Sequence, residues 1–502
     1  MDLRDHTQAR GQTSMRADVV IVGTGPGGAA AGRVLAEAGL RVVMLEEGPA
    51  RPRFRPNLAN VNRYHMQEGG AMIARGSQLM PIAAGRGVGG GSLVNSALSF
   101  RTPDSVLEGW TTLLEDDRYG PQAMRPVFDE LGTLLEIGLT PPDIAGENNL
   151  LICRGVEKLG LRGGLAPRNA PRCVGCGFCN YGCPVGGKAS VDTNLIPMAL
   201  GHDATVQADT VVDRILLDAS DTHVRGVSGR VLDPDTREEV GRIEVLADTV
   251  FVCAGGIGTP RLLHHAGLAA RLGPAVGRGL HVHPGNVVLG ECAHDVHMWS
   301  GATQGAWFES DDLPGVLPHT ATLPPGALLL LFGRVGLRAK ADLARMRKMA
   351  GCIVMVSDKG EGRISARSDG NADITYDFAP DDIQRIKDGM VLAGRVLLAG
   401  GAQKLLAPVH GLGQHRTIES FEAALATRTI RDFTLYAAHP MSSCRMGRDP
   451  ATSVIGKTGE THRISGLYLS DSSIFPTSLG VNPQYTTMTM STVIARHFVE
   501  SA

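Results

Sequence analysis

The clearest pattern of hydrophobic and polar positions lies near the N-terminus, over residues 17–48. An unbroken apolar run from Val19 to Val22 has the length of a strand that is buried on both faces. Small residues from Ala29 to Ala38 then indicate a helix, and a second apolar run from Arg41 to Leu45 indicates another strand. The pattern predicts a βαβ unit with two parallel strands.

The turn between the first strand and the helix carries glycines at the spacing Gly-x-Gly-x-x-Gly, namely Gly23, Gly25 and Gly28. In a dinucleotide-binding turn the first glycine permits the tight turn, the second lets a diphosphate approach, and the third lets helix and strand pack closely. Glu46 ends the second strand, where an acid can bind ribose hydroxyls. The motif predicts a dinucleotide but does not separate FAD from NAD, and a glycine-rich turn without ligand is the simpler alternative.

Further along the chain the pattern changes twice. Residues 283–433 alternate strand-like segments with loops and amphipathic helices, one of them over Ala379 to Ala399, which is typical of a mostly antiparallel sheet. From residue 434 onward the pattern of the first domain returns, with a strand over Leu467 to Ser470 and a helix over Tyr485 to Glu500. We therefore predict a discontinuous Rossmann-type α/β domain, 17–282 and 434–502, and an α+β domain, 283–433. Residues 1–16 are polar and are expected to be a disordered leader, with Met15 as a possible alternative start.

Composition narrows the class of protein without naming it. The 502 residues are 43% hydrophobic and 20% charged, with a formal net charge of −2 and no basic block, which argues against nucleic acid as a partner. No apolar run approaches the roughly 18 residues of a transmembrane helix, and no signal-peptide core is present. Scattered cysteines fit a reducing compartment. These features predict a cytoplasmic enzyme without a transmembrane segment.

Four further blocks follow in order along the chain: GRGVGGGSLVN from Gly85 to Asn95, GGIGTPRLL from Gly255 to Leu263, AHPMSSCRMG from Ala438 to Gly447, and the stretch from Gly466 to Pro483. Together with the βαβ unit they resemble the glucose–methanol–choline (GMC) oxidoreductases, FAD enzymes that oxidise alcohols. Small departures, such as Thr259 where the family often has Ser, do not disturb the order. The His block and the stretches SDKGEGRI and FPTSLGVNPQ are more similar to the branch that oxidises long-chain and steroid alcohols.

The resemblance implies a noncovalently bound FAD, an FAD-binding domain over 17–282 and 434–502, and a substrate-binding domain over 283–433. It also implies roles for single residues. Those expected to hold the cofactor are Gly23, Gly25 and Gly28 at the diphosphate, Glu46 at the adenosine ribose, Gly90, Ser92 and Asn95 beside the flavin, and Asp471 near the ribityl–diphosphate portion. His439 and Asn482 are expected to face the reacting end of the flavin across the substrate.

Alcohol oxidation removes a proton from oxygen and a hydride from carbon, and oxidised flavin can accept the hydride. A histidine near neutral pH suits the proton, so His439 is the predicted base. Asn482 cannot act as a base, but its amide can hold the substrate oxygen. A core histidine and an Asn-Pro turn are the simpler interpretations. His281 and His283 could line the cavity or bind a metal, although a structural role is the expectation.

The predicted function is FAD-dependent oxidation of an apolar alcohol to a carbonyl, with oxygen or an electron-transfer partner as acceptor. Two alternatives stay open. One is a flavoenzyme of the same fold with non-oxidative chemistry, such as elimination or isomerisation. The other is a flavin or iron–sulfur electron carrier without a substrate of its own.

The cysteine-rich stretch 173–188 poses a separate question. Cys173, Cys176, Cys179 and Cys183 follow the pattern C-x2-C-x2-C-x3-C-P of bacterial ferredoxins. We predict one iron–sulfur cluster, which would give electrons a one-at-a-time exit. A structural thiol or disulfide loop is the main alternative, since similar segments occur in the alcohol-oxidising branch, and zinc is the least favoured because its sites usually draw on two separated pairs.

Overall fold

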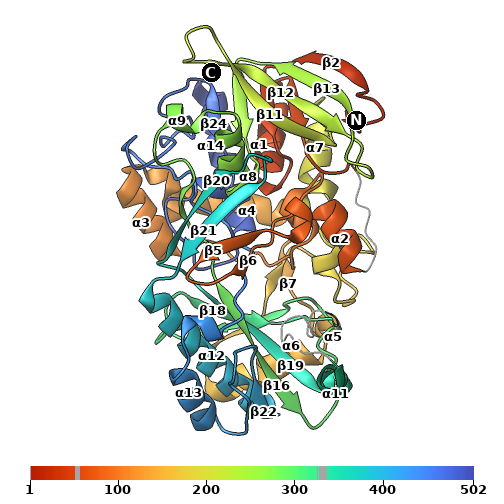
Figure 1. Cartoon of the computed structure of the whole chain (residues 1–502), viewed down its shortest axis with the longest axis vertical. Coiled ribbons are helices and arrows are strands. Elements are labelled where there is room, and N and C mark those ends of the chain that lie inside the picture. The colour runs from red at the N-terminus through yellow and green to blue at the C-terminus, as the bar shows by residue number, and fades with distance from the viewer. Residues whose placement is uncertain (1, 51–56, 325, 327–335, 502) are drawn as a thin grey trace.

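A computed structural model of the chain describes residues 2–50, 57–324, 326 and 336–501. Figure 1 shows an elongated molecule with two unlike halves. The upper half holds a parallel sheet, and the lower half holds an antiparallel sheet covered by helices. The predicted fold class, an α/β nucleotide-binding fold combined with an antiparallel sheet, is confirmed.

The parallel sheet has the strand order β1-β10-β4-β3-β14-β24, and every neighbouring pair is parallel. Its central strands are apolar and buried, because helix α1 contacts β3 and β4 while strands of a second sheet, β11 (Thr210–Leu217) and β12 (Val224–Leu232), contact β4 and β14. Helices α1 and α14 lie side by side against it. The strands are β1 (Asp2–Arg4), β10 (Thr205–Gln207), β4 (Val42–Leu45), β3 (Val19–Val22), β14 (Thr249–Val252) and β24 (Leu467–Leu469), and the helices are α1 (Pro26–Glu37) and α14 (Gln484–Ser501). Both ends of the chain thus build one sheet.

The N-terminal residues correct a prediction, because they are ordered strands and not a disordered leader. β1 pairs in parallel with β10, and β2 (Gly11–Arg16) pairs in parallel with β13 (Glu239–Leu246). β2 closes a four-stranded sheet of order β11-β12-β13-β2, which includes β11 (Thr210–Leu217) and β12 (Val224–Leu232). Its side chains are exposed or half-buried, so backbone hydrogen bonds hold it in place. Hydropathy does not reveal an edge strand of this kind.

The antiparallel sheet of the lower half has the order β23-β22-β16-β19-β18-β17-β8. Helix α12 (Pro380–Gly400) packs on its centre, and α6 (Glu147–Leu159) packs on α12. The strands are β23 (Gln414–His415), β22 (Ala402–Leu406), β16 (Gly285–Cys292), β19 (Met349–Val356), β18 (Val316–Thr320), β17 (Ala306–Glu309) and β8 (Arg162–Leu165). Since β8 and α6 come from the stretch assigned to the first domain, this half is not confined to residues 283–433.

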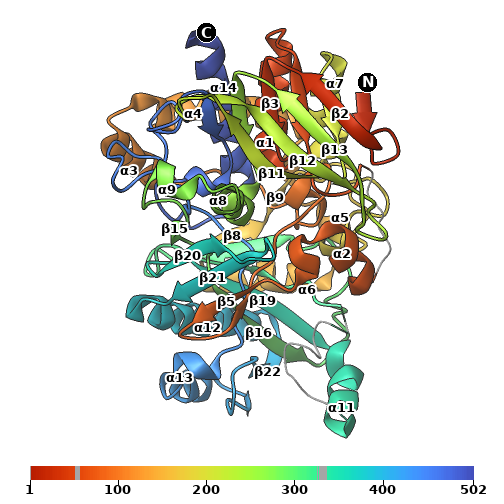
Figure 2. The same ribbon diagram turned by 45° about the horizontal axis from the view of Figure 1, so that its top comes forward.

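A smaller sheet of order β15-β20-β21-β5-β6 lies between the two halves (Figure 2). Its strands are β15 (Arg278–Leu280), β20 (Glu361–Ala366), β21 (Ala372–Asp377), β5 (Ile73–Gly76) and β6 (Met80–Pro81). A two-stranded ladder joins β7 (Gly138–Leu139) to β9 (Pro167–Arg168). Among the described residues, the other α-helices are α2 (Leu58–His65), α3 (Asp104–Leu114), α4 (Pro121–Leu134), α5 (Pro142–Ala145), α7 (Leu195–Gly201), α8 (Gly255–His265), α9 (Ala269–Leu272), α11 (Gly336–Met346) and α13 (Ile418–Ala426).

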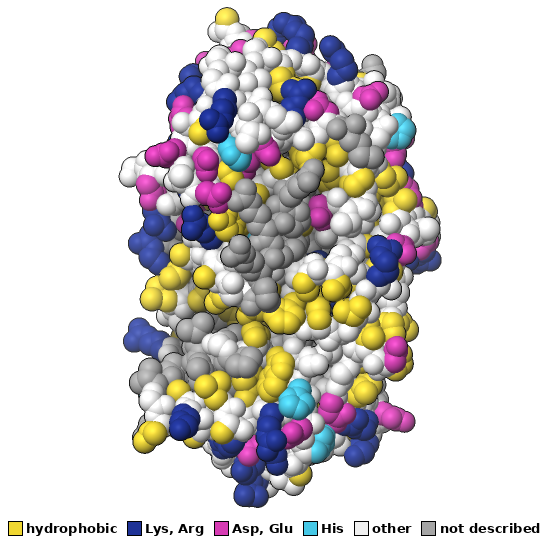
Figure 3. Space-filling view, turned by 90° about the vertical axis from the view of Figure 1, so that its right-hand side faces the viewer, with side chains coloured by type: hydrophobic (Ala, Val, Ile, Leu, Met, Phe, Trp, Pro, Cys, Tyr) yellow, Lys and Arg dark blue, Asp and Glu magenta, His cyan; other side chains and the backbone are white. Residues whose placement is uncertain are grey.

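The surface carries both signs of charge. On the face drawn in Figure 3, basic and acidic side chains are intermixed, and hydrophobic side chains gather across the middle of the molecule. Within the described residues, no helix is long and apolar enough to cross a membrane. The predicted cytoplasmic location stays a prediction.

Candidate active site

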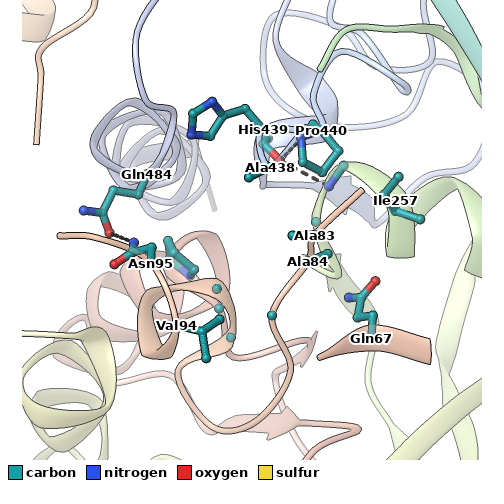
Figure 4. A pocket seen from close by; sticks show the side chains of 18 of the residues that line it. Gln67, Ala83, Ala84, Val94, Asn95, Ile257, Ala438, His439, Pro440 and Gln484 are labelled. Atoms are coloured by element: carbon teal, nitrogen blue, oxygen red, sulfur yellow. Dashed lines mark hydrogen bonds between the residues drawn. The ribbon is translucent and has the colours of Figure 1, made fainter. Parts of the chain in front are cut away.

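One large cavity, of about 580 Å³, lies where the predicted blocks meet. Its walls come from the glycine turn after β3, the acidic end of β4, the second glycine cluster, the start of α8 and the two C-terminal blocks. Figure 4 shows part of this wall, with His439, Asn95 and Gln484 around the opening. Residues more than 400 positions apart in the chain therefore share one site, as the lining by Gly23 and His439 shows.

The first glycine turn is shaped by steric necessity. Gly23 has a φ of +101°, and a Cβ there would lie 2.5 Å from the carbonyl oxygen of Cys253. A Cβ on Gly28 would overlap the carbonyl oxygen of Gly23, so this glycine lets α1 approach β3. Gly25 faces the cavity beside Gly90, and α1 has no side-chain cap at its N-terminus. The turn is an open cradle with the free N–H groups that favour a phosphate.

Glu46 lines the cavity and also holds the two glycine turns together. One carboxylate oxygen accepts hydrogen bonds from the Thr24 N–H (3.0 Å) and hydroxyl (2.8 Å), and the other accepts from the N–H groups of Gly48 and Gly87 (both 3.0 Å). Burial raises the pKa of this carboxyl above its ordinary value. The sequence predicted only a ribose contact for Glu46, and that contact stays a prediction.

The second glycine cluster presents Asn95 to the cavity, while Ser92 supports the turn from behind. Ser92 donates to the Gly89 carbonyl (2.7 Å) and accepts from the Val191 N–H (3.2 Å), and it does not line the cavity. The Asn95 amide donates to the Gln484 side chain at 2.6 Å (Figure 4). Gln484 begins α14 and lines the cavity, yet nothing in its local sequence had singled it out.

Asp471 lines the cavity just beyond β24, and its carboxylate joins the segment after β24 to the start of α8. Its carboxylate accepts from the Gly255 N–H (2.9 Å), the Thr259 hydroxyl (2.5 Å) and the Ser473 N–H (2.7 Å). Burial raises its pKa. Thr259, which departs from the family pattern, thus has a definite partner. The carboxylate fixes two loops that form one wall of the site.

His439 and Asn482, both predicted to face the flavin, lie side by side, and their roles stay a prediction. An amide N–H of Asn482 lies 3.1 Å from Nε2 of His439. Nδ1 of His439 and Oδ1 of Asn482 are buried and have no hydrogen-bond partner among the residues that the structure describes. Burial lowers the pKa of His439 well below 6.5, and the neighbouring His283 and His319 lower it further. The imidazole is therefore neutral near pH 7 and able to accept a proton.

Two other histidines stand beside this pair. The rings of His283 and His439 are edge to face with centroids 5.4 Å apart, and His283 Nε2 accepts from the Gly480 N–H at 2.9 Å. Burial lowers the pKa of His283 and of His319 to about 4. Both line the cavity, whereas His281 does not. From the sequence we expected a structural role for His283, with the cavity wall or a metal as alternatives. His319 was not identified, because only the sheet brings β18 to the site.

The part of the cavity nearest the antiparallel sheet is largely apolar. Its apolar lining comes from β16, β19 and the segments after β18 and before His439, and its polar lining is sparse. The apolar residues there are Val287, Leu323, Ile353 and Met355, with Tyr436 beside them, and the polar ones are Gln304, His319 and Thr322. Such a chamber suits the hydrocarbon part of a ligand.

The cysteine run lies against the same site but forms a separate small cavity of about 10 Å³, lined by all four thiols. Nη2 of the buried Arg168 lies 3.3 Å from the Cys179 sulfur, and the Gly187 N–H lies 3.2 Å from the Cys183 sulfur. Throughout the ranges that the structure describes, no group of three or more His, Cys, Asp or Glu side chains is placed to hold a metal ion. This structure therefore does not show the predicted iron–sulfur ligand set, although all four thiols line one cavity.

The disulfide alternative is not shown either, because all nine cysteines are free thiols. The run nevertheless contacts the main site. Asn180 lines the large cavity, and the buried ammonium group of Lys188 donates to the carbonyls of Leu93 and Asn95 (2.9 and 3.0 Å). Burial lowers the pKa of Lys188 to about 8.

Comparison with known proteins identifies the family. Residues 63–285 and 358–491 match the models described as GMC oxidoreductase, and residues 16–54 match an FAD-binding domain. An uncharacterised GMC-type oxidoreductase of Mycobacterium tuberculosis is 34% identical over 488 residues, which cover 96% of this chain and 75% of that protein. The chain belongs to the GMC oxidoreductases, and its fold and glycine turns fit FAD.

Two other known proteins are similar to this chain, one in sequence and one in fold. A long-chain-alcohol oxidase of Arabidopsis thaliana is 28% identical over 526 residues, covering 96% of this chain and 66% of that protein. Among solved structures, pyridoxine 4-oxidase from Mesorbium loti superposes with a TM-score of 0.71 at 18% identity, covering 96% of this chain and 99% of that one. At that identity the likeness shows the fold alone.

Proposed function

We propose that this oxidoreductase oxidises an apolar alcohol to the carbonyl, with His439 as the base. The observation that carries the proposal is the contact between His439 and Asn482, 3.1 Å apart, on the wall of a cavity that both glycine turns also line. When bound, the oxidised flavin supplies a hydride acceptor. The chain itself must take the hydroxyl proton and hold the oxygen.

His439 is suited to the proton because its pKa is lowered, so that Nε2 carries a lone pair at neutral pH. A substrate hydroxyl placed next to Nε2 also lies within reach of the Asn482 amide. That amide would donate to the oxygen as its negative charge develops. The two side chains thus divide the work: one accepts the proton and the other stabilises the oxygen.

The apolar chamber supports the choice of substrate class. Val287, Ile353 and Met355 face the cavity from the antiparallel sheet, and burying a hydrocarbon chain there would contribute about 25 cal/mol per Å². Gln304, His319 and Thr322 are the polar exceptions. We expect long-chain or steroid alcohols to reduce the flavin at lower concentration than short-chain alcohols do.

The test is anaerobic bleaching of the flavin by a panel of short-chain, long-chain and steroid alcohols. His439→Ala should lower the rate constant of bleaching by about 10²–10⁴-fold, with FAD still bound. The exposed His297, whose side chain is 49% accessible, offers the matched control His297→Ala, which should bleach normally. Intact bleaching in His439→Ala would refute the base assignment.

The same measurement separates the alternatives. In an electron carrier without its own substrate, none of the alcohols would bleach the flavin. A non-oxidative enzyme would convert its substrate without reducing the flavin. We keep the iron–sulfur prediction as a separate hypothesis, because the four thiols line one cavity beside Asn95 and Asn180. Iron and labile sulfide content with an EPR spectrum of anaerobically purified protein decides it, since flavin bands without iron would remove the cluster.

A further inference from the structure

A buried carboxylate outside the cavity connects the two segments that hold the reacting side chains. Asp358 follows β19, is 3% exposed and does not line the cavity. Oδ2 accepts from the Val282 N–H (2.8 Å) and the Tyr376 hydroxyl (2.7 Å). Oδ1 accepts from the Ser478 hydroxyl (2.8 Å) and, more weakly, from the His283 N–H (3.3 Å).

These contacts join the segment of His283 to the segment from Ser478 to Gly480. Asp358 holds the backbone at His283, whose φ of +49° is unusual for a residue with a side chain. The His283 ring accepts from the Gly480 N–H at 2.9 Å, and Ser478, two residues earlier, returns to Asp358. Asn482 lies two residues after Gly480 in the same segment, and its amide contacts His439. The hydrogen bonds of Asp358 therefore hold the segment that carries Asn482.

The charge of the carboxylate has an effect of its own. Burial opposes its ionisation, but the adjacent His281, whose Nδ1 lies 3.6 Å from Oδ2, and the Tyr376 hydroxyl hold the pKa of Asp358 below its ordinary value. Burial and the histidines His283 and His319 all lower the pKa of His439, while Asp358 acts in the opposite direction. An ionised Asp358 therefore stabilises His439 in the protonated form that it takes on during the proposed reaction.

We propose that Asp358 is a positioning residue for this reaction: by fixing His283 and Ser478 it sets Asn482 against His439. The inference rests on the proposed function of that pair. The side chain touches neither the cavity nor a reacting atom, so its effect passes through the two segments it holds. A displacement of about 1 Å in such a pair can cost on the order of 10²-fold in rate.

The test compares holoenzymes by anaerobic stopped-flow with the alcohol that bleaches the wild type best. Asp358→Asn keeps the shape but removes the charge and turns one acceptor into a donor facing other donors. We expect a fall in the bleaching rate constant on the order of 10²-fold, with the dissociation constant of the alcohol changed less than about threefold because the apolar chamber is untouched. An unchanged rate constant would overturn the proposal.

A matched pair keeps the test decisive if Asp358→Asn fails to fold. Ser478→Ala and Tyr376→Phe each remove one hydroxyl donor from the same carboxylate, but only Ser478 belongs to the segment that carries Asn482. Ser478→Ala should slow bleaching about tenfold and Tyr376→Phe less than about twofold. Thermal unfolding of both variants is measured as well, so that a loss of stability is not mistaken for an effect on the reaction. Equal rates in the two variants would show a purely structural carboxylate. If none of the alcohols bleaches the flavin of the wild type, the proposed alcohol oxidation is wrong, whatever the variants do.

Discussion

The two ends of the large cavity are built by different means. The end that we expect to hold the diphosphate consists of backbone, with Gly23, Gly25 and Gly28 in one turn and Gly90 in a second turn against it. The reacting end consists of side chains, His439 and Asn482, that distant segments bring together. The first end requires glycines, which have no Cβ atom, and the second end requires two side chains in the right positions. Each end should therefore fail in its own way.

The largest effect is expected at the backbone end, from Gly28→Ala. The added Cβ would overlap the Gly23 carbonyl oxygen, and because that atom belongs to the backbone it cannot move aside. We expect a loss of stability of about 1–3 kcal/mol or more and purified protein with little FAD, as measured by thermal unfolding and the ratio of flavin to protein absorbance.

Gly109→Ala is the matched control for this steric argument. Gly109 lies inside α3 with no atom near its missing Cβ, so alanine there should raise stability by about 0.5–1 kcal/mol. If both variants behave alike, the close contact at Gly28 is not what limits the turn.

At the side-chain end, Asn482→Ala should leave FAD bound and slow the chemistry. Removing the amide takes away the proposed donor to the developing oxygen charge, and we expect the bleaching rate constant to fall by about 10²–10³-fold. The FAD content should match that of the wild type. If the variant loses FAD instead, Asn482 contributes to cofactor binding and not only to the reaction.

The acid side of the pH dependence sharpens the same division. Burial lowers the pKa of His439 below 6.5, so the neutral base persists below that pH and is lost only as the pH falls through the lowered value. The bleaching rate constant should stay level from pH 7 to below 6.5, as measured by stopped-flow in a series of buffers. A midpoint near 6.5 would mean that the base is solvated like a free histidine.

The smallest effect concerns stability. Burial lowers the pKa of His319 to about 4 from 6.5, so the unfolded chain binds the proton more readily and stability falls as the pH drops through this window. Between pH 7 and pH 5 this histidine should account for about 2 kcal/mol of lost stability. His319→Gln should remove that part, as denaturant unfolding at the two pH values would show. An equal loss in wild type and variant contradicts it.

How much the sequence predicted follows the same contrast. The βαβ unit, with Gly28 and Glu46, was predictable because its whole logic lies within one contiguous stretch. His439 and Asn482 were predictable because ordered blocks resemble those of a known family. Their contact at 3.1 Å, however, depends on packing between segments.

The rest could not be predicted because it depends on proximity. His319 sits in an ordinary strand and becomes a cavity residue only when β18 pairs with β19. Gln484 matters because it meets Asn95, which lies far away in the chain. The cysteine spacing predicted a ligand set, but spacing does not determine how four sulfurs are oriented around a cavity.

The N-terminal strands have a consequence for self-association. β1 occupies one edge of the parallel sheet, and β2 occupies one edge of the four-stranded sheet. A chain that began at Met15 would lack β1 and most of β2, and would leave β10 and β13 with unpaired backbone groups along two edges. Open edges of this kind recruit strands from other molecules. The polar first residues thus cover two sheet edges, although none of residues 2–16 lines the large cavity.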